Sequence, residues 1–108
     1  MKRHVEDEIL VGIIADAGDS QSCSMGAIEA ARGGDFQEAN SLLQESQQAL
    51  LRAHAAHTEL ISADAGQGLE ITFIMVHASN HLSVAELSLN FAQEIVLLYQ
   101  KIGGTSHV

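Results

Sequence analysis

The sequence predicts an all-α protein built from three long antiparallel helices. No proline occurs among its 108 residues, so no pyrrolidine ring interrupts the backbone hydrogen bonds of a long helix. Glycine clusters divide the chain at residues 33–34, 66–68 and 103–104. Because glycine just past the last turn commonly terminates a helix, these clusters predict three helix ends. We expect one domain, residues 1–108, with helices over about residues 5–32, 36–65 and 70–102.

The first segment shows the weakest helical pattern of the three. Its apolar residues recur at helical spacing, but Gly12, Gly18 and Gly26 interrupt them. Gly18 and Asp19 are candidate positions for a kink or a short break. Glycines at these positions would also let a neighbouring helix approach closely.

The second segment has a clear start signal and one long apolar stripe. Asp35 follows the first glycine pair and Glu38 stands three residues later, the pattern of an N-cap with a capping-box partner. A helix should therefore start at about Phe36. Its apolar stripe recurs at helical spacing and contains Phe36, Ala39, Leu43, Leu50, Ala53, His57 and Leu60.

The third segment combines a strand-like start with two apolar stripes. Residues 71–76 have high β-propensity, but the helical periodicity that follows favours a helix. The core stripe contains Ile74, Ala78, Leu82, Ala85, Leu89, Ala92, Val96 and Tyr99. The outer stripe contains Phe73, Val76, Asn80, Val84, Leu87, Phe91 and Leu98. Since one stripe is enough to pack the helix within the chain, the other predicts contact with another subunit. Asn80 either fixes the register of that contact or lies solvated at its edge.

The charge and the cysteine content exclude several classes of protein. A formal net charge of −9 argues against nucleic acid and anionic membranes as partners. The charge either favours a basic protein partner or serves solubility alone. The single cysteine, Cys23, cannot form an intrachain disulfide, and we expect a cytoplasmic protein. The apolar run 9–15 is too short to span a bilayer and makes a poor signal peptide.

Four of the six histidines form two pairs at helical spacing. His54 and His57 are three residues apart and His77 and His81 are four apart, so each pair shares one helix face. Such a pair is either part of a metal site, a half-buried structural feature or a nucleophilic site. A neutral imidazole is a good nucleophile near pH 7. The apolar neighbours of His77 would shield a phosphoryl adduct from water, while His81 and Ser79 offer hydrogen-bond donors.

No other catalytic or phosphate-binding signature occurs in the sequence. It contains no serine or cysteine nucleophile motif, no paired-carboxylate site, no GxGxxG or P-loop and no zinc-finger spacing. The glycine clusters are interpreted as helix ends rather than as phosphate-binding loops. The residues alone therefore leave the metal, structural and phosphocarrier interpretations of His77 open.

Four motifs, in their order and spacing, resemble one protein family. Residues 17–22 (AGDSQS) are similar to the AGDARS-like stretch of the family's first helix, and residues 34–43 (GDFQEANSLL) to the GDF opening of its second. Residues 53–61 (AHAAHTELI) are similar to its AHxxQTxLI stretch, and residues 76–82 (VHASNHL) to its VHAQDHLM signature. From about residue 9 to residue 101, the chain resembles the lactose/cellobiose-specific IIA component of the bacterial phosphoenolpyruvate-dependent sugar phosphotransferase system.

The resemblance implies a homotrimer of three-helix subunits that acts as a phosphotransferase component. His77 stands at the family's acceptor position, so it would accept a phosphoryl group from the histidine phosphocarrier protein and pass it to a cysteine of the IIB component. The membrane IIC component, met only indirectly, then phosphorylates a sugar of the cellobiose, chitobiose and lactose class. His81, His57 and Ser79 would support the phosphoryl site. We expect no required cofactor and no nucleic-acid partner.

The sequence departs from the family pattern at several polar positions. Asn80 stands where the family has an aspartate that can hold a divalent metal at the trimer axis. A neutral amide oxygen is a weaker ligand for a hard cation than a carboxylate, so we expect less metal dependence here. His57 and Ser79 each replace a glutamine, and Gln21 replaces an arginine. These changes motivate an alternative function, a regulatory or scaffold helical trimer with weakened phosphotransfer.

Overall fold

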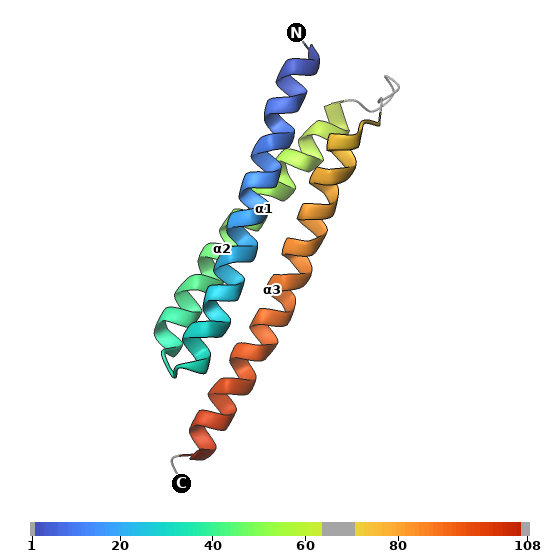
Figure 1. The fold of residues 1–108 in the computed structure, drawn as a ribbon. Helices are drawn as coiled ribbons and strands as arrows, with labels where there is room; N and C mark the ends of the chain where they lie inside the picture. Colours follow the sequence, from blue (N-terminus) through green and yellow to red (C-terminus); the bar gives the residue numbers. More distant parts are fainter. Residues whose placement is uncertain (1, 64–70, 107–108) are drawn as a thin grey trace.

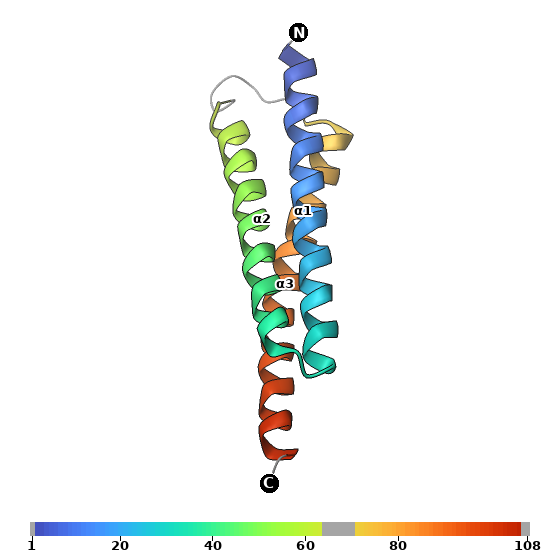
Figure 2. The ribbon, with the colours of Figure 1, turned by 90° about the vertical axis from the view of Figure 1, so that its left-hand side faces the viewer.

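Three antiparallel helices make up the part of the chain that the structure describes. The computed structural model describes the backbone of residues 2–63 and 71–106 and the side chains of residues 6–62 and 71–103. Within these ranges the elements are helices only: α1 (Lys2–Arg32), α2 (Phe36–Ala63) and α3 (Phe73–Ser106). α2 runs antiparallel to both α1 and α3, and α3 extends past the turn that joins α1 to α2 (Figure 1, Figure 2). The predicted all-α, three-helix fold is confirmed.

The turn between α1 and α2 is fixed by backbone hydrogen bonds at both helix ends. Gly34 has a φ of +86°, a region that glycine enters without steric cost. The Gly34 N–H donates to the Ala31 carbonyl at 3.0 Å and the Asp35 N–H to the Ala30 carbonyl at 2.9 Å, which together form a Schellman motif. Asp35 then caps α2, because its Oδ1 accepts from the Glu38 N–H at 3.1 Å. The capping box is only half formed, since the Asp35 N–H is already bound to Ala30.

The start of α3 lies three residues later than the predicted start at residue 70. Thr72 caps the helix: its Oγ1 accepts from the Met75 N–H and its carbonyl oxygen from the Val76 N–H, both at 3.3 Å. Residues 71 and 72 are not helical, and helical backbone begins at Phe73. The predicted end of α2 at residue 65 and the glycines at 66 and 68 lie outside the described residues.

Glycines inside α1 and α3 do not break these helices. α1 is continuous, so it has no break at Gly18. An isolated glycine weakens a helix but leaves its backbone hydrogen bonds intact. A Cβ added at Gly12 or Gly18 would meet nothing within 4 Å, whereas one at Gly26 would lie 3.3 Å from Leu42 Cδ1. Of the three glycines in α1, Gly26 alone is confirmed as a position of close approach to another helix.

The sequence predicts that the glycine pair at 103–104 ends the third helix, and this prediction is wrong. The helix continues to Ser106. A Cβ added at Gly103 would lie 3.5 Å from Cζ of Phe36, the first residue of α2. The helix therefore passes through this glycine, which lies beside the Phe36 ring.

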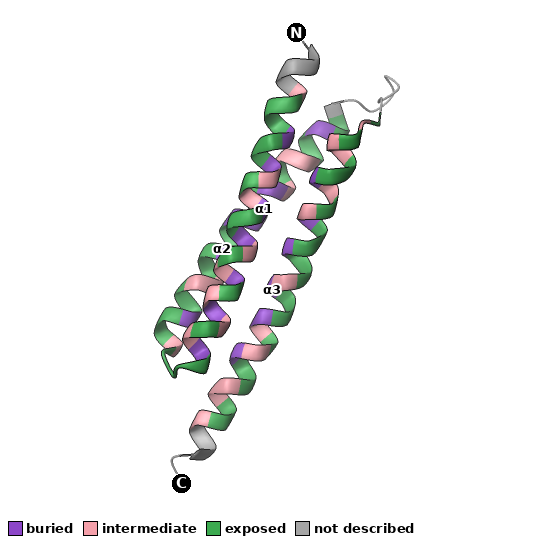
Figure 3. Ribbon diagram, viewed as in Figure 1, coloured by how far each residue is buried: buried purple, intermediate pink, exposed green. Residues whose placement is uncertain are grey.

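A core rich in alanine runs along the inside of the bundle (Figure 3). The core stripe of α3 is buried or half-buried along its whole length, as predicted. Small side chains let the helices pack closely, while larger apolar residues fill the space between them. The fully or almost fully buried apolar residues are Leu10, Ile13, Ala17, Ala27, Ala31, Ala39, Ala49, Leu50, Ala53, Leu60, Ala78, Leu82, Ala85, Leu89, Ala92 and Val96.

Three buried serines join α1 to α2 within this core. Ser20, Ser24 and Ser46 are completely buried. Ser46 Oγ donates to the Ser20 carbonyl at 2.7 Å and lies 2.9 Å from Ser20 Oγ and 2.7 Å from Ser24 Oγ. A buried hydroxyl without a partner is costly, so this cluster favours one register of α1 against α2. The apolar periodicity of the sequence did not reveal it.

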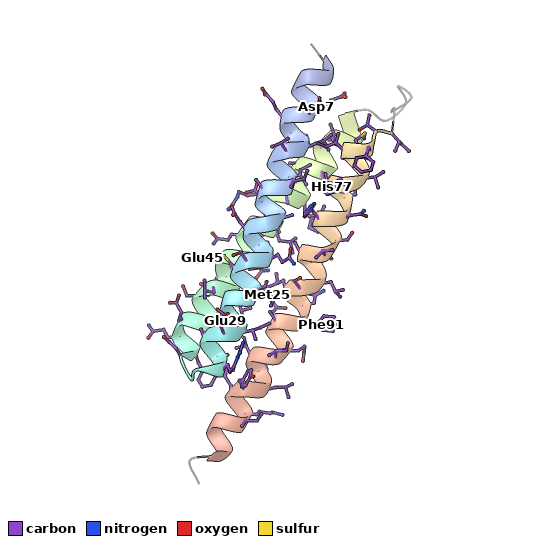
Figure 4. All side chains as sticks on the ribbon, in the orientation of Figure 1. Asp7, Met25, Glu29, Glu45, His77 and Phe91 are labelled. Atoms are coloured by element: carbon purple, nitrogen blue, oxygen red, sulfur yellow. The ribbon has the colours of Figure 1, made fainter. Side chains whose placement is uncertain are left out.

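The outer stripe of α3 points away from α1 and α2. The exposed fraction of Phe73 is 87%, and Figure 4 shows Phe91 directed away from the other helices. The remaining apolar members are 47–59% exposed: Val76, Val84, Leu87, Phe91 and Leu98. The chain thus covers one of the two apolar faces of α3 and leaves the other uncovered. Across the described residues, the helices lack the long apolar stretch that crossing a bilayer requires.

Two glycine-to-alanine substitutions should change stability in opposite directions. Gly18→Ala places a methyl group in open space inside a helix and should raise the free energy of unfolding by about 0.5–1 kcal/mol. Gly34→Ala forces a side chain into left-handed backbone and should lower it by about 1–2 kcal/mol. Urea unfolding at one fixed protein concentration measures both. Equal effects of the two substitutions would contradict the described turn.

Candidate functional site

The first turns of α3 place two histidine rings in contact. His77 and His81 are four residues apart, and side chains at this spacing lie one above the other on a helix. Their Nε2 atoms are 3.2 Å apart, and their ring centroids are 4.5 Å apart with an interplanar angle of 85°. Since two neutral imidazoles share one hydrogen bond by donation from one N–H to the other's lone pair, one of these Nε2 atoms donates and the other accepts.

His77 is exposed and lies on the side of α3 that faces α1 (Figure 4). Phe73 stacks on it, with ring centroids 6.3 Å apart and an interplanar angle of 10°. The apolar cover of His77 within the chain is therefore the Phe73 ring, and the other face of the imidazole is open. Phe73 was not among the apolar neighbours expected for His77, although its four-residue spacing from His77 on a helix predicts the contact.

His57 and Ser79 form a second contact on a different side of α3. His57 Nε2 lies 3.0 Å from Ser79 Oγ, in a half-buried position between α2 and α3. Two residues along an α-helix turn the side-chain direction by about 200°. Ser79 therefore faces α2, while His77 emerges on the opposite flank of the core stripe. The structure brings His57 and Ser79 together, but within one chain it does not bring either of them to His77.

A mostly apolar groove of about 280 Å³ adjoins the His57–Ser79 contact at the end of the bundle where α3 begins. Its lining combines core residues with members of the outer stripe: Leu10, His57, Leu60, Ile61, Ile71, Met75, Val76, Ser79 and Asn80. Asn80 is exposed at the outer stripe. The groove therefore opens onto the uncovered face of α3.

His54 bonds to a partner of its own. Its Nε2 lies 3.3 Å from Glu86 Oε2, an ion pair when the imidazole is protonated. Together with the His57–Ser79 contact, it ties α2 to α3. The ring nitrogens of His54 and His57 thus contact different residues, and the two histidines do not form one binding site. In the described ranges, no group of three or more His, Cys, Asp or Glu side chains is arranged to hold a metal ion.

Cys23 lies far along α1 from the histidines, in a groove between α1 and α2. Burial raises the pKa of its thiol, and the negative charges of Glu45 and Asp19 raise this pKa further. Glu45 Oε2 lies 4.0 Å from Cys23 Sγ. Because the thiolate is the reactive form of cysteine, these surroundings keep Cys23 a poor nucleophile.

Comparisons with known proteins agree on one family. The model of the family described as PTS system, Lactose/Cellobiose specific IIA subunit, matches residues 8–100 of this chain. The lichenan-specific phosphotransferase enzyme IIA component of Bacillus subtilis is 42% identical over 97 residues, which are 89% of this chain and 88% of that protein.

Two solved structures share the fold. The cellobiose-specific enzyme IIA of the phosphotransferase system from Bacillus anthracis has a TM-score of 0.86 and 32% identity, covering 90% of each chain. The IIA(chitobiose) chain, solved in complex with HPr of the Escherichia coli phosphotransferase system, has a TM-score of 0.81 and 33% identity. That likeness covers 90% of this chain and 95% of the other.

The reactivity of Cys23 should follow from its raised pKa. Less thiolate is present at a given pH than for an unperturbed cysteine, so iodoacetamide should alkylate the native protein more slowly than the urea-unfolded protein at pH 8. Glu45→Gln removes one negative charge and should speed alkylation of the native protein. Intact mass followed over time measures both rates. Native alkylation as fast as that of the unfolded chain would contradict the proposed surroundings of the thiol.

Proposed function

Because the chain belongs to the lactose/cellobiose-specific IIA family of the sugar phosphotransferase system, we propose that His77 is its phosphorylated residue. The protein is a IIA component of the cellobiose, chitobiose and lactose class, and hence a phosphotransferase component. The single observation that carries the assignment of His77 is its geometry: an exposed ring with a neighbouring imidazole nitrogen 3.2 Å from its own Nε2. A nucleophile needs access to its partner, and His77 has it.

The histidine phosphocarrier protein HPr is the donor that we assign to this transfer. A relative with 33% identity forms a complex with HPr, and the net charge of −9 favours a basic partner. The lone pair of a His77 ring nitrogen attacks phosphorus, and the bond from phosphorus to the donor's histidine breaks. In the next step a cysteine thiolate of the IIB component attacks the same phosphorus, and His77 recovers its lone pair. The membrane IIC component then uses the group to phosphorylate sugar, so the protein works in the cytoplasm.

His81 is suited to stabilise the phosphoryl group on His77. Phosphoryl transfer requires mainly positioning and charge stabilisation from the protein. A ring N–H of His81 in contact with His77 can donate to a phosphoryl oxygen after small rotations of both rings. His57 and Ser79 act at a greater distance, by holding α2 against α3 through their mutual hydrogen bond.

The phosphocarrier function is favoured over the scaffold alternative by the positions of the altered residues. His57 and Ser79 are two of the departures that motivated a scaffold, and they bond to each other across α2 and α3. One departure thus compensates the other and satisfies a half-buried polar contact. Neither change removes a contact between His77 and His81. The acceptor and its neighbour therefore keep the arrangement that transfer needs.

The uncovered outer stripe of α3 supports a homotrimer with α3 at the symmetry axis. A chain of three helices has no further element to cover these apolar side chains, so copies of the same helix are the available partner. Asn80 would then face its symmetry mates, with a neutral amide where the family resemblance implies an aspartate. No charge at this layer needs to be neutralised, so we propose a trimer that requires neither a cofactor nor an axial metal ion.

Substitutions of the paired histidines test the assignment of the acceptor. His77→Ala should abolish phosphorylation, because it removes the nucleophile. His81→Ala should slow phosphorylation by at least about tenfold without ending it, because it removes a donor to the phosphoryl oxygens. Intact mass after incubation with phosphoenolpyruvate, enzyme I and HPr measures the added phosphoryl group.

His54→Ala is the matched control for those two variants, since His54 contacts Glu86 and not His77. Its phosphorylation should match that of the unaltered protein. A phosphoryl group on the His77→Ala protein, together with none on the His81→Ala protein, would assign the acceptor to His81 instead.

The proposed trimer has its own test in light scattering. The mass should be about three times 11.5 kDa, and excess chelator should change neither the mass nor the thermal midpoint. Leu87→Asp places a charge on the outer stripe and should shift the protein toward monomer. Leu51→Asp is the matched control, because Leu51 is similarly exposed (59% against 55%) but lies on α2. A monomer for the unaltered protein, or dissociation on adding chelator, would refute this assembly.

A further inference from the structure

We propose that His77 and His81 together bind a zinc-type transition-metal ion, and that the bound ion blocks phosphorylation of His77. The two Nε2 atoms are 3.2 Å apart. Zinc–nitrogen bonds of about 2.0–2.1 Å in tetrahedral geometry place two ligand nitrogens about 3.3–3.4 Å apart. The pair is therefore almost at chelating distance before any metal is present.

Only the ring directions must change for this pair to chelate. At present one Nε2–H points at the neighbouring nitrogen, so the two lone pairs do not converge. Rotation about χ2 is soft for histidine, and both rings lie at least partly exposed at the surface of α3. The proton on the donating Nε2 moves to Nδ1 of the same ring. Both Nε2 lone pairs are then free for the metal, and the charge of the protein is unchanged.

No competing contact holds these two rings in the described part of the chain. Their nitrogens hydrogen-bond only to each other, and Phe73 contacts His77 by stacking. The other histidine pair behaves differently, because His57 bonds to Ser79 and His54 to Glu86. The two histidine pairs have similar spacing in the sequence but differ in whether their ring nitrogens can bind a metal ion. Of the two, the pair on α3 has both Nε2 atoms free of other side chains.

The number of ligands makes this a reversible site. The described residues supply no third His, Cys, Asp or Glu beside the pair, so water would complete the coordination of the ion. Such a site lacks the closed shell of structural zinc sites and should exchange its metal readily. Imidazole ligands favour Zn²⁺, Cu²⁺ and Ni²⁺ over Mg²⁺, which prefers oxygen. The site is also separate from Asn80, which offers an amide oxygen on the outer stripe.

Binding of the ion and transfer of the phosphoryl group exclude each other. If His77 attacks phosphorus through the lone pair that the metal occupies, then no bond to phosphorus can form until the metal leaves. A phosphoryl group on His77 likewise removes the ligand from the metal. This half of the inference rests on the proposed function of His77, whereas metal binding itself does not.

Zinc titration in the absence of any phosphoryl donor tests the site directly. Isothermal calorimetry should show one Zn²⁺ per chain at this site, and Mg²⁺ should give no binding there. Second-shell substitutions alone weaken metal binding by about 10- to 100-fold, so His77→Ala and His81→Ala should each weaken zinc binding by at least that factor. His54→Ala, a matched control that also removes one histidine, should bind zinc as the unaltered protein does, because His54 contacts Glu86 and not the pair. Unchanged binding after His77→Ala or His81→Ala would overturn the site.

A transfer assay tests the inhibition separately. Purified phosphorylated HPr is mixed with the protein without enzyme I, so that zinc cannot act on the upstream enzyme. Saturating Zn²⁺ should slow phosphorylation of the unaltered protein by about tenfold or more. The slower His81→Ala protein should show no such dependence on zinc, and this variant also controls for zinc bound to HPr. Equal inhibition of both proteins would overturn the regulatory half. Absence of phosphorylation on His77 without zinc would instead overturn the proposed function and leave the calorimetric result intact.

Discussion

Two apolar faces on one helix are the constraint on which this molecule depends. α1 and α2 bury the core stripe of α3, where Ala78, Ala85 and Ala92 are completely buried, and they leave the outer stripe exposed. His77 stands between these faces in the sequence as well as in space, with Val76 of the outer stripe before it and Ala78 of the core stripe after it. The proposed acceptor therefore emerges where the covered and the uncovered faces of α3 meet. A position at this edge lets packing hold the backbone while the ring stays accessible.

Periodicity in the sequence predicts the buried faces well and the helix ends less well. A core stripe depends on many residues at once, so single exceptions do not hide it. A helix end depends on a few local hydrogen bonds instead. Thr72 caps the start of α3 through its own side chain, whereas α3 continues past Gly103 although the sequence places a glycine pair there. The hydrogen bonds between the buried serines of α1 and α2 could not be predicted from the sequence either. Ser20 and Ser46 are 26 residues apart, and each interrupts an apolar pattern.

The candidate site shows the same division between local and long-range information. The contact of His77 with His81 followed from their four-residue spacing, because both rings belong to one helix. The hydrogen bond between His57 and Ser79 crosses from α2 to α3, and no spacing within one helix predicts it. In the sequence these two positions read as separate departures from the family pattern. In the structure they form one contact, so the two departures act on the same place in the molecule.

Exposure of His77 has consequences for both steps of phosphoryl transfer. A carrier must receive the group from one protein and give it to another, so deep burial of the acceptor would hinder both encounters. Within the chain, the stacked ring of Phe73 covers only one face of the imidazole. In the proposed trimer, further protection of a phosphoryl adduct from water would come from another subunit on the outer stripe or from the partner protein during transfer. The proposed transfer and the proposed metal site draw on the same lone pair of His77, so phosphorus and a metal ion would compete for it.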